Sequence, residues 1–249
     1  MLSQKELDRY YRQIIFPEFG ERRQEKLKNS HVLIAGIGGL GSLSSIYLAR
    51  AGVGHMTIVD NDYVELSDLN RQILYQDENI GERKVDSAHK RLLGMNPYIE
   101  VTPIFAKIQK DNVSDIVKGA QVVVDGLDNF ETRFLLNSVC VKENIPFVYG
   151  GIDGFNGAIS TIIPGKTPCL ACLFKRIPKE EKDFLPVFGF IPGFIASLQS
   201  MEAIKLLANI GIPLAGKLLL FDGKTGEFLL SKTNKDNDCP VCGKEKIRG

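Results

Sequence analysis

The residues most able to do chemistry begin with a glycine-rich run that follows a buried apolar stretch. Gly36, Gly38, Gly39 and Gly41 lie in a G-x-G-x-x-G pattern. Glycines there allow a tight turn and let backbone N–H groups and a helix N-terminus approach phosphate oxygens. Asp60 ends the next predicted strand, 19 residues after Gly41. An acidic side chain at this position can accept hydrogen bonds from ribose hydroxyls. The pattern predicts an adenine-nucleotide site and leaves both NAD and ATP open.

A set of cationic and polar residues helps to choose between these nucleotides. Arg12 lies near the N-terminus, Asn70, Arg71 and Gln72 follow the second strand, and Lys84 lies near the start of the next helix. A triphosphate that reacts at phosphorus needs several cations to stabilise developing charge. Arg suits bidentate phosphate contacts, and Lys acts as a point charge. Each cation alone is typical of a solvated surface, so only the whole set favours ATP.

Asp128 and Asn129 follow a later apolar strand that ends at Asp125. Open α/β sheets bind ligands at the carboxyl ends of their strands, and a carboxylate there can hold Mg²⁺ against phosphate oxygens. Asp128 can equally cap the helix that begins near Asn129, which is a common use of aspartate. On residue type alone, both interpretations of Asp128 stay open.

Four of the five cysteines form two C-x-x-C pairs, Cys169 with Cys172 and Cys239 with Cys242, separated by 66 residues. Four thiolates complete a tetrahedral shell with no open position, so the pairs predict a structural Zn²⁺ site. A redox pair or two disulfides would use the same residues, but paired knuckles in a cytosolic chain favour zinc. Cys140 shares the apolar face of a predicted helix and is expected to be a buried, unreactive thiol.

Alternating strands and helices must position these residues. Near-continuous apolar strands between helices are typical of a mainly parallel sheet covered on both faces. We predict an α/β fold with a Rossmann-like, mainly parallel sheet that continues into an antiparallel portion carrying the zinc site. In the first half, strands are predicted over 31–36, 55–60, 99–106, 121–125 and 147–150, and helices over 40–51, 82–95 and 131–144.

The second half has a different pattern. It contains an alternating strand, a helix opened by Pro192 and a hairpin around a GKTG turn; these are predicted over 157–163, 193–208, and 217–221 with 227–231. The polar tail 232–249 would fray unless the zinc site anchored it. We predict a single domain over 1–249, with a nucleotide-binding half at about 1–155 and a mixed half at about 156–249.

Composition excludes several classes of protein. With 31 Lys and Arg against 30 Asp and Glu, the chain lacks the basic excess that nucleic acid or an anionic membrane selects. Its longest mostly apolar stretch is too short to span a bilayer, and residues 1–13 are charged, unlike a signal peptide. Five cysteines, an odd count, argue against a full disulfide framework. We expect a soluble, cytoplasmic protein with no nucleic-acid or membrane partner.

A series of motifs along nearly the whole chain resembles the ThiF/HesA/MoeB family, the bacterial relatives of ubiquitin-activating enzymes. The motifs are RYxRQ (9–13), GIGGLG (36–41), IVDND (58–62), DLNRQ (68–72), Lys84, DGLDN (125–129), CxxC (169–172), LQSMEAIKLL (198–207), LFDG (220–223) and CPVCG (239–243). The resemblance implies a homodimeric adenylyltransferase. In such enzymes the C-terminal Gly-Gly carboxylate of a small ubiquitin-like sulfur carrier attacks the α-phosphate of Mg-ATP. A sulfur donor, such as a cysteine desulfurase or rhodanese, then converts the acyl-adenylate to a thiocarboxylate.

The resemblance also implies roles for single residues. The glycine loop and Asp60 would bind ATP, with Asn70, Arg71, Gln72 and Lys84 around the phosphates and Asn129 at the same site. Asp128 would hold Mg²⁺ and be catalytic together with Arg71 and Arg12. In the family the arginine that matches Arg12 comes from the second subunit, so a dimer would complete each site.

The sequence departs from part of the family. Thiamine-thiazole members carry a cysteine after the first zinc pair, whereas residues 173–238 contain none. This favours the molybdopterin-synthase-activating type, which only adenylates its carrier, and leaves the pathway open. The stretch 188–192 (FGFIP) is bulkier than the small-residue stretch usual there, and 173–192 is expected to be a mobile crossover loop over the carrier tail.

Two other functions are compatible with the glycine loop. An NAD-dependent oxidoreductase would use the loop and Asp60 but leave Arg12, Arg71, Lys84 and Asp128 without a role. The other function is a non-catalytic nucleotide-binding scaffold or the inactive half of a heterodimer. The presence of both Arg12 and Asp128 argues against it, because inactive halves tend to lose such groups.

Overall fold

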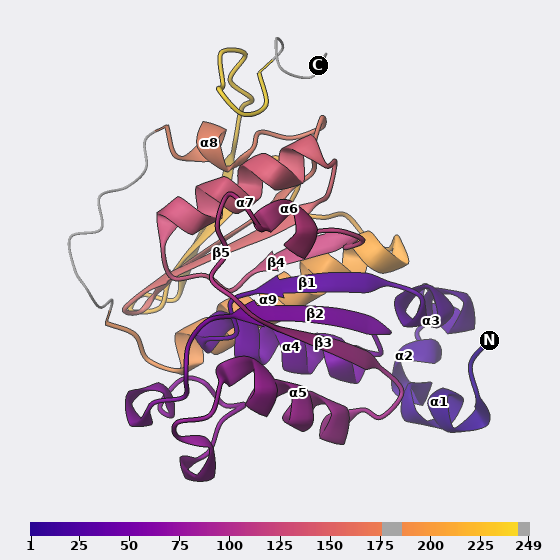
Figure 1. The fold of residues 1–249 in the computed structure, drawn as a ribbon. Coiled ribbons are helices and arrows are strands. Elements are labelled where there is room, and N and C mark those ends of the chain that lie inside the picture. Colours follow the sequence, from indigo (N-terminus) through magenta and orange to yellow (C-terminus); the bar gives the residue numbers. More distant parts are fainter. Residues whose placement is uncertain (176–185, 244–249) are drawn as a thin grey trace.

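A single eight-stranded sheet forms the centre of the computed structural model, which describes residues 1–175 and 186–243 (Figure 1). Its strand order is β3-β2-β1-β4-β5-β6-β7-β8; the first five strands in this order pair in parallel and the remaining pairings are antiparallel. This confirms the predicted fold class. The strands are β1 (His31–Ala35), β2 (His55–Asp60), β3 (Glu100–Phe105), β4 (Val122–Asp125), β5 (Phe147–Asp153), β6 (Asn156–Ile162), β7 (Lys217–Asp222) and β8 (Glu227–Lys232).

Helices cover both faces of the parallel strands, which explains why β1 and β4 are apolar almost throughout. Successive side chains alternate between faces, so Val32 and Ile34 join one apolar core while Leu33 and Ala35 join the other. The first core lies against α4 (Gly39–Ala51), α5 (Lys84–Met95) and α9 (Phe190–Ala208). The second lies against α6 (Val113–Ile116), α7 (Phe130–Lys142) and α8 (Leu170–Leu173).

Three helices that the sequence patterns did not predict precede β1. They are α1 (Gln4–Arg9), α2 (Tyr11–Ile14) and α3 (Gly20–Lys28), and they lie at the amino ends of the parallel strands (Figure 1). The Gln13 side-chain amide donates to the carbonyl of Ala51, 3.1 Å away, which ties α2 to the C-terminal end of α4. Two short 3-10 helices, Leu66–Asp68 and Asp77–Asn79, lie in the long connection from β2 to α5.

Most element boundaries moved by one to three residues from those predicted. The helix predicted at 82 begins at Lys84, because Arg83 is extended and precedes the first turn. Helix α9 begins at Phe190, so Pro192 lies inside its first turn, where a missing N–H costs little. The predicted hairpin is confirmed, with Asp222 paired to Glu227 beside the turn.

Three expectations have different outcomes. Among the described residues, no helix has the length and apolar character needed to cross a membrane. The division into halves near residue 155 coincides with the β5–β6 turn and stays a prediction. Of the predicted crossover loop 173–192, residues 176–185 lie outside the described residues.

Candidate nucleotide-binding and metal sites

The glycine loop joins β1 to α4, as predicted. A Cβ at Gly41 would lie 1.9 Å from the Gly36 carbonyl oxygen, so the loop can fold back on itself only without that atom. Gly36 has a φ of +86°, in the left-handed region that favours glycine. Gly38 is the N-cap of α4, so the amino end of this 13-residue helix opens at the carboxyl edge of the parallel strands. Such an end is suited to bind phosphate.

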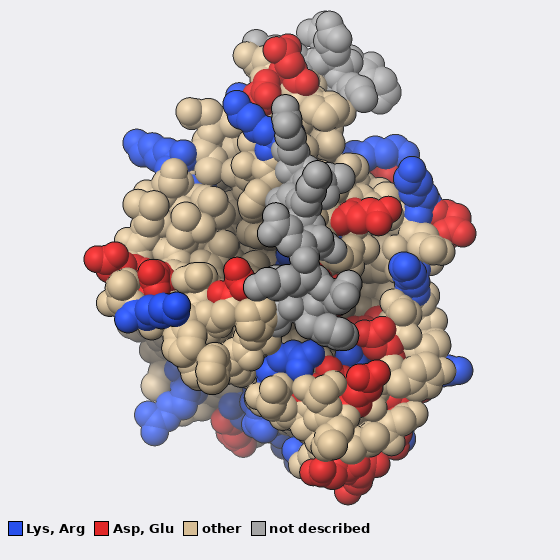
Figure 2. All heavy atoms as spheres, turned by 90° about the vertical axis from the view of Figure 1, so that its left-hand side faces the viewer, with Lys and Arg blue, Asp and Glu red and all other residues tan. Residues whose placement is uncertain are grey.

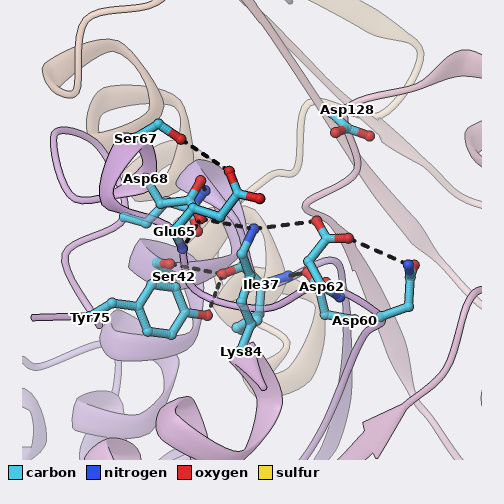
Figure 3. A network of polar contacts seen from close by, with 12 residues as sticks. Ile37, Ser42, Asp60, Asp62, Glu65, Ser67, Asp68, Tyr75, Lys84 and Asp128 are labelled. Carbon is cyan, nitrogen blue, oxygen red and sulfur yellow. Dashed lines mark hydrogen bonds and ion pairs between the residues drawn. The ribbon is translucent and has the colours of Figure 1, made fainter. Parts of the chain in front are cut away.

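Asp60, the predicted ribose ligand, also holds the glycine loop in place. Its Oδ2 accepts a hydrogen bond from the Ile37 backbone N–H, and its Oδ1 accepts one from the Asp62 N–H, both at 2.8 Å (Figure 3). Burial raises the pKa of Asp60, and these two backbone donors partly oppose that rise. A carboxylate has about four lone-pair sites, so acceptor capacity remains for sugar hydroxyls.

Two residues that sequence reasoning did not assign to the site, Ser42 and Tyr75, support the same loop. Both hydroxyls donate to the Ile37 carbonyl oxygen, from 3.0 and 2.9 Å (Figure 3). Burial raises the pKa of Tyr75 well above its ordinary value, so its hydroxyl keeps the proton that it donates. The loop is therefore fixed at Ile37 through both its N–H and its carbonyl group.

Lys84 and Arg71 form ion pairs with Asp62 and Asp68, two carboxylates that the sequence reasoning did not assign to the site. The Lys84 Nζ lies 3.3 Å from Asp62 Oδ2 and 3.4 Å from Asp68 Oδ2 (Figure 3). The Arg71 Nη2 lies 3.2 Å from Asp68 Oδ1. Lys84 is only 6% exposed, and a buried ammonium group requires such partners. Asp62 and Asp68 lie within the IVDND and DLNRQ motifs, which was the available signal.

Two further predicted residues lie beside these ion pairs: Gln72, which is buried, and Asn70, which is exposed. The Gln72 side chain is 3% exposed and donates to Asp68 Oδ1 from 2.7 Å, while its Oε1 atom is buried without a hydrogen-bond partner. A Cβ at Gly38 would lie 3.8 Å from Gln72 Nε2, so Gln72 lies against the glycine loop. Asn70 is exposed and its Oδ1 accepts from Arg71 Nη1 at 3.2 Å. These predicted residues therefore do gather beside the loop.

The loop after β4 lies back to back with the glycine loop. Gly126 donates its N–H to the Ala35 carbonyl, 2.7 Å away, and a Cβ at Gly36 would lie 2.6 Å from the Gly126 carbonyl oxygen. Asp125 is fully buried, where its Oδ2 lies 3.0 Å from Arg133 Nε. Burial raises the pKa of Asp125, although the Arg133 charge opposes this. Arg133 also donates to the Leu127 carbonyl, so it fixes the loop that ends at Asp128.

The structure excludes one of the two interpretations of Asp128, and its role toward Mg²⁺ stays a prediction. Asn129, not Asp128, is the N-cap of α7, and its Oδ1 accepts from the Thr132 N–H at 2.9 Å. The helix-cap alternative for Asp128 is therefore wrong. Asp128 is exposed, its Oδ1 accepts from the Asn129 amide at 3.1 Å, and Figure 3 shows it apart from the Lys84 cluster, on the neighbouring loop. Its carboxylate is available to bind a hard cation such as Mg²⁺.

Arg12 does not join this group within one chain. It lies in α2, which contacts the C-terminal end of α4, whereas the glycine loop lies at the N-terminal end of that helix. Thirteen helical residues span about 20 Å. Figure 1 shows α2 and the glycine loop at opposite ends of the parallel strands. A single chain therefore brings together the predicted nucleotide residues except Arg12.

Charges of both signs surround the carboxyl edge of the parallel strands. Figure 2 faces this edge, and its described surface carries acidic and basic side chains interspersed with uncharged atoms. A nucleic-acid site would require a continuous basic surface. The visible distribution matches the balanced composition of the chain.

The four paired cysteines come together as predicted. Their sulfur atoms all lie within 4.8 Å of one another, with Cys169 and Cys239 3.6 Å apart and Cys172 and Cys242 3.5 Å apart. A tetrahedral zinc ion with Zn–S bonds of about 2.3 Å separates its sulfurs by about 3.8 Å, so these residues fit zinc. Zinc itself stays a prediction.

The remaining thiol, Cys140, is buried in α7 as predicted, and its lack of reactivity stays a prediction. Burial raises the pKa of Cys140 to about 12. All five cysteines lie among the described residues, and each is free of a disulfide. The disulfide alternative is therefore wrong for this structure.

Comparison with known proteins gives consistent matches. The model of the ThiF family matches residues 10–241. The chain is 42% identical to the SAMP-activating enzyme E1 of Haloferax volcanii, covering 97% of this chain and 91% of the relative. It is 40% identical to the sulfur carrier protein adenylyltransferase of Thermus thermophilus, covering 98% and 93%. It is 38% identical to the molybdopterin-synthase adenylyltransferase of Salmonella typhimurium, covering 97% and 98%.

A solved structure agrees with these relatives in fold. The crystal structure of E. coli MccB with ATP superposes with a TM-score of 0.77 at 27% identity, covering 89% of this chain and 68% of MccB. The residues that the ThiF model matches, 10–241, include all eight strands of the sheet. The matches therefore extend over the parallel and the antiparallel halves.

Proposed function

The chain belongs to the ThiF family, and from this membership we propose that it is an ATP-dependent adenylyltransferase acting on a small ubiquitin-like sulfur-carrier protein. One observation carries the proposal. Three features lie together at the carboxyl edge of the parallel strands: the glycine loop, the ion pairs of Lys84 and Arg71, and the carboxylate of Asp128, which does not cap α7. The names of relatives that share about 40% of its residues, among them a sulfur carrier protein adenylyltransferase, support the same activity.

The proposed reaction is a substitution at the α-phosphorus of ATP. The C-terminal carboxylate oxygen of the carrier forms a bond to that phosphorus, and the bond to the bridging oxygen of the β-phosphate breaks. The products are a carrier acyl-adenylate and pyrophosphate. Such a step depends on positioning and charge stabilisation more than on a protein nucleophile.

Each group at the site has a part in this step. The N-terminus of α4 and the glycine loop bind phosphate oxygens, and the Asp60 carboxylate accepts hydrogen bonds from the ribose hydroxyls. Lys84 and Arg71 stabilise the charge that develops on the phosphates, oriented by the carboxylates of Asp62 and Asp68. Asp128 would hold Mg²⁺, which would neutralise phosphate charge when bound.

The distance of Arg12 from the glycine loop supports a homodimer in which Arg12 serves the site of the other subunit. The face beside α2 is suited to a second copy. It carries an apolar groove of about 720 Å³ between α2, α3, α4 and α9, with Tyr47 and Met201 in its lining. Phe16, which also lines it, is 51% exposed. Exposed apolar surface of this kind marks protein contacts.

The positions of the cysteines bear on the identity of the carrier and its pathway. We propose a carrier that ends in Gly-Gly and is only adenylated, because residues 173–238 contain no cysteine that could bond to it. This favours the molybdopterin-synthase type over the thiamine-thiazole type, with a separate sulfur donor such as a cysteine desulfurase or rhodanese. The cysteine cluster would hold a structural zinc ion that anchors the C-terminal tail.

The test uses the purified full chain with ATP, Mg²⁺ and small Gly-Gly-ending proteins from its own cell. We expect mass spectrometry to show a carrier with an added AMP, and carrier-dependent exchange of labelled pyrophosphate into ATP. A competition between ATP and NAD for the enzyme serves as the control for the oxidoreductase alternative. Binding of NAD in preference to ATP, with no adenylated carrier, would contradict the proposal.

A further inference from the structure

Three phenylalanines border the candidate site on the side of the antiparallel strands. Phe155 lies in the turn between β5 and β6, Phe188 lies just before α9, and Phe190 is the first residue of that helix. Their ring centroids are 4.9 Å apart for Phe155 and Phe188, 5.4 Å for Phe155 and Phe190, and 5.6 Å for Phe188 and Phe190. Rings at such distances attract one another. We call these three residues the aromatic cluster.

Backbone hydrogen bonds fix the cluster from both sides. Gly154 donates its N–H to the Pro186 carbonyl, 2.7 Å away, and forms a β-bridge with Val187. Gly223, the residue after β7, donates its N–H to the Phe155 carbonyl from 2.8 Å. The Ile191 N–H donates to the Phe188 carbonyl from 2.9 Å. The three rings are therefore a preformed surface, which lowers the cost of binding to it.

The aromatic cluster is continuous with the candidate nucleotide site. A Cβ at Gly189, between the two exposed rings, would lie 2.5 Å from the Asn70 carbonyl oxygen and 3.3 Å from the Arg71 Cα. Three residues after Gly189, the Pro192 Cβ would lie 3.3 Å from a Cβ at Gly39. The segment that carries the rings therefore packs against both the glycine loop and the backbone of Arg71.

Two of the three rings remain exposed despite their contacts with one another, whereas Phe155 is half-buried. Phe188 is 56% exposed and Phe190 57%. Clustered exposed apolar side chains beside a functional site mark a binding surface, and aromatic residues are frequent anchors of such surfaces. The exposed rings offer an apolar surface, which an apolar side chain of a ligand can cover.

We propose that the aromatic cluster binds an apolar side chain in the C-terminal tail of the carrier protein, and so selects which carrier is adenylated. The inference rests on the proposed function. The carboxylate of the tail must reach the α-phosphate beside the glycine loop and Arg71, and the adjoining surface is the aromatic cluster. An extended chain advances about 3.3 Å per residue. Tail residues only a few positions before the carboxylate are therefore placed to contact the rings.

A double-mutant cycle tests this contact. The third to sixth residues from the C-terminus of the carrier are each replaced by Ala, and each variant is assayed with wild-type, Phe188→Ala and Phe190→Ala enzyme. With wild-type enzyme we expect one tail substitution to raise the carrier KM about tenfold, as burial of one apolar side chain allows. With Phe188→Ala enzyme the same substitution should change KM less than about twofold. The dissociation constant for ATP without carrier should not change.

Phe228→Ala is the matched control. Phe228 is equally exposed, at 56%, but belongs to a separate group of rings with Phe194 and Phe221. Any effect of Phe228→Ala on the carrier KM should multiply with the effect of the tail substitution, without coupling.

Three outcomes would overturn the inference. If the effects of Phe188→Ala and every tail substitution simply multiply, the inference fails while the proposed function stands. If Phe188→Ala instead changes the molar mass in solution, the aromatic cluster is an interface between copies of this chain. If wild-type enzyme supports no exchange with any carrier, the proposed function fails and the inference fails with it.

Discussion

The two ends of the sheet hold their functional residues in different ways. At the carboxyl edge of the parallel strands, buried charges and backbone contacts fix the site. Asp125 is fully buried and Asp68 is 5% exposed. In the antiparallel half, β8 is exposed along its whole length, with Leu229 at 62%. The chain then continues to Cys239 and Cys242, which meet the cysteines of the α8 segment.

The difference teaches that buried polar contacts fix the first region, whereas the second brings together four cysteines whose sulfur atoms lie within 4.8 Å of one another. The parallel strands lie between two apolar cores, so their loops can hold buried polar groups in fixed positions. Of residues 233–243, the part beyond β8 that the structure describes, only Cys239, Cys242 and Gly243 are buried. Segments that bury so little need a metal or another cross-link to stay ordered. Damage to the first region should therefore remove activity, whereas damage to the second should remove local stability.

The largest expected effect is on the first region. Asp128→Ala should reduce carrier-dependent ATP–pyrophosphate exchange about 10³-fold, because the loss of one group that stabilises developing charge costs up to this factor. The exposed side chain should leave thermal unfolding unchanged. Asp115→Ala, at an exposed aspartate of α6, is the matched control and should retain full exchange. Undiminished exchange in Asp128→Ala would disprove the assigned role.

Arg12→Ala tests whether the site extends across two subunits. Alone it should lower exchange about 10²-fold, since one phosphate-binding cation is lost. Mixed with Asp128→Ala subunits, it should recover about a quarter of wild-type exchange, because random pairing makes half the dimers mixed and each then has one intact site. The exchange rate of the mixture is the measurement. No recovery after subunit mixing would argue against a shared site.

Removal of metal tests the second region. A chelator should lower the Tm of the wild-type protein by about 5–10 °C, as a loss of a few kcal/mol would in a chain of this size. It should also expose residues 232–243 to limited proteolysis while ATP binding persists. Cys239→Ser should already show the lower Tm and should not respond to the chelator. A metal requirement that acts at once and reversibly on the chemical step would contradict a structural role.

The smallest expected effect concerns Cys140, which belongs to the buried region. Burial raises its pKa to about 12, so its reactive thiolate is scarce at pH 8 and increases only as the pH approaches that value. Brief treatment with iodoacetamide at pH 8 should therefore leave Cys140 unmodified in the folded protein and modify it after unfolding. Peptide mass spectrometry measures the adduct. After chelation, the paired cysteines should react while Cys140 still does not.

Much of the site was predictable because its signals are local. The glycine pattern requires a strand, a turn and a helix that are adjacent in sequence, and the two C-x-x-C pairs contain their own ligand spacing. Asp62, Asp68 and Arg133 escaped prediction because their importance lies in contacts with Lys84, Arg71 and Asp125. Charged residues of this kind are more often exposed than buried, so residue type gave no reason to select them.

The sheet was also predictable from local patterns, whereas the short helices at the N-terminus were not. Apolar strands between amphipathic helices indicated the mainly parallel sheet. The short helices α1, α2 and α3 were not predicted, because four to nine residues are too few for a clear periodicity. Their position depends on contacts such as that between Gln13 and Ala51.

The sequence by itself determined the type of chemistry: a glycine loop for phosphate, cations for a triphosphate and four thiolates for a metal ion. Only the tertiary structure decided how the single residues are used. It gave the cap of α7 to Asn129 and so left Asp128 available, and it placed Arg12 far from the glycine loop of its own chain. The physical reason is that residue type limits what a side chain can bind, whereas distance and burial select which partner it meets.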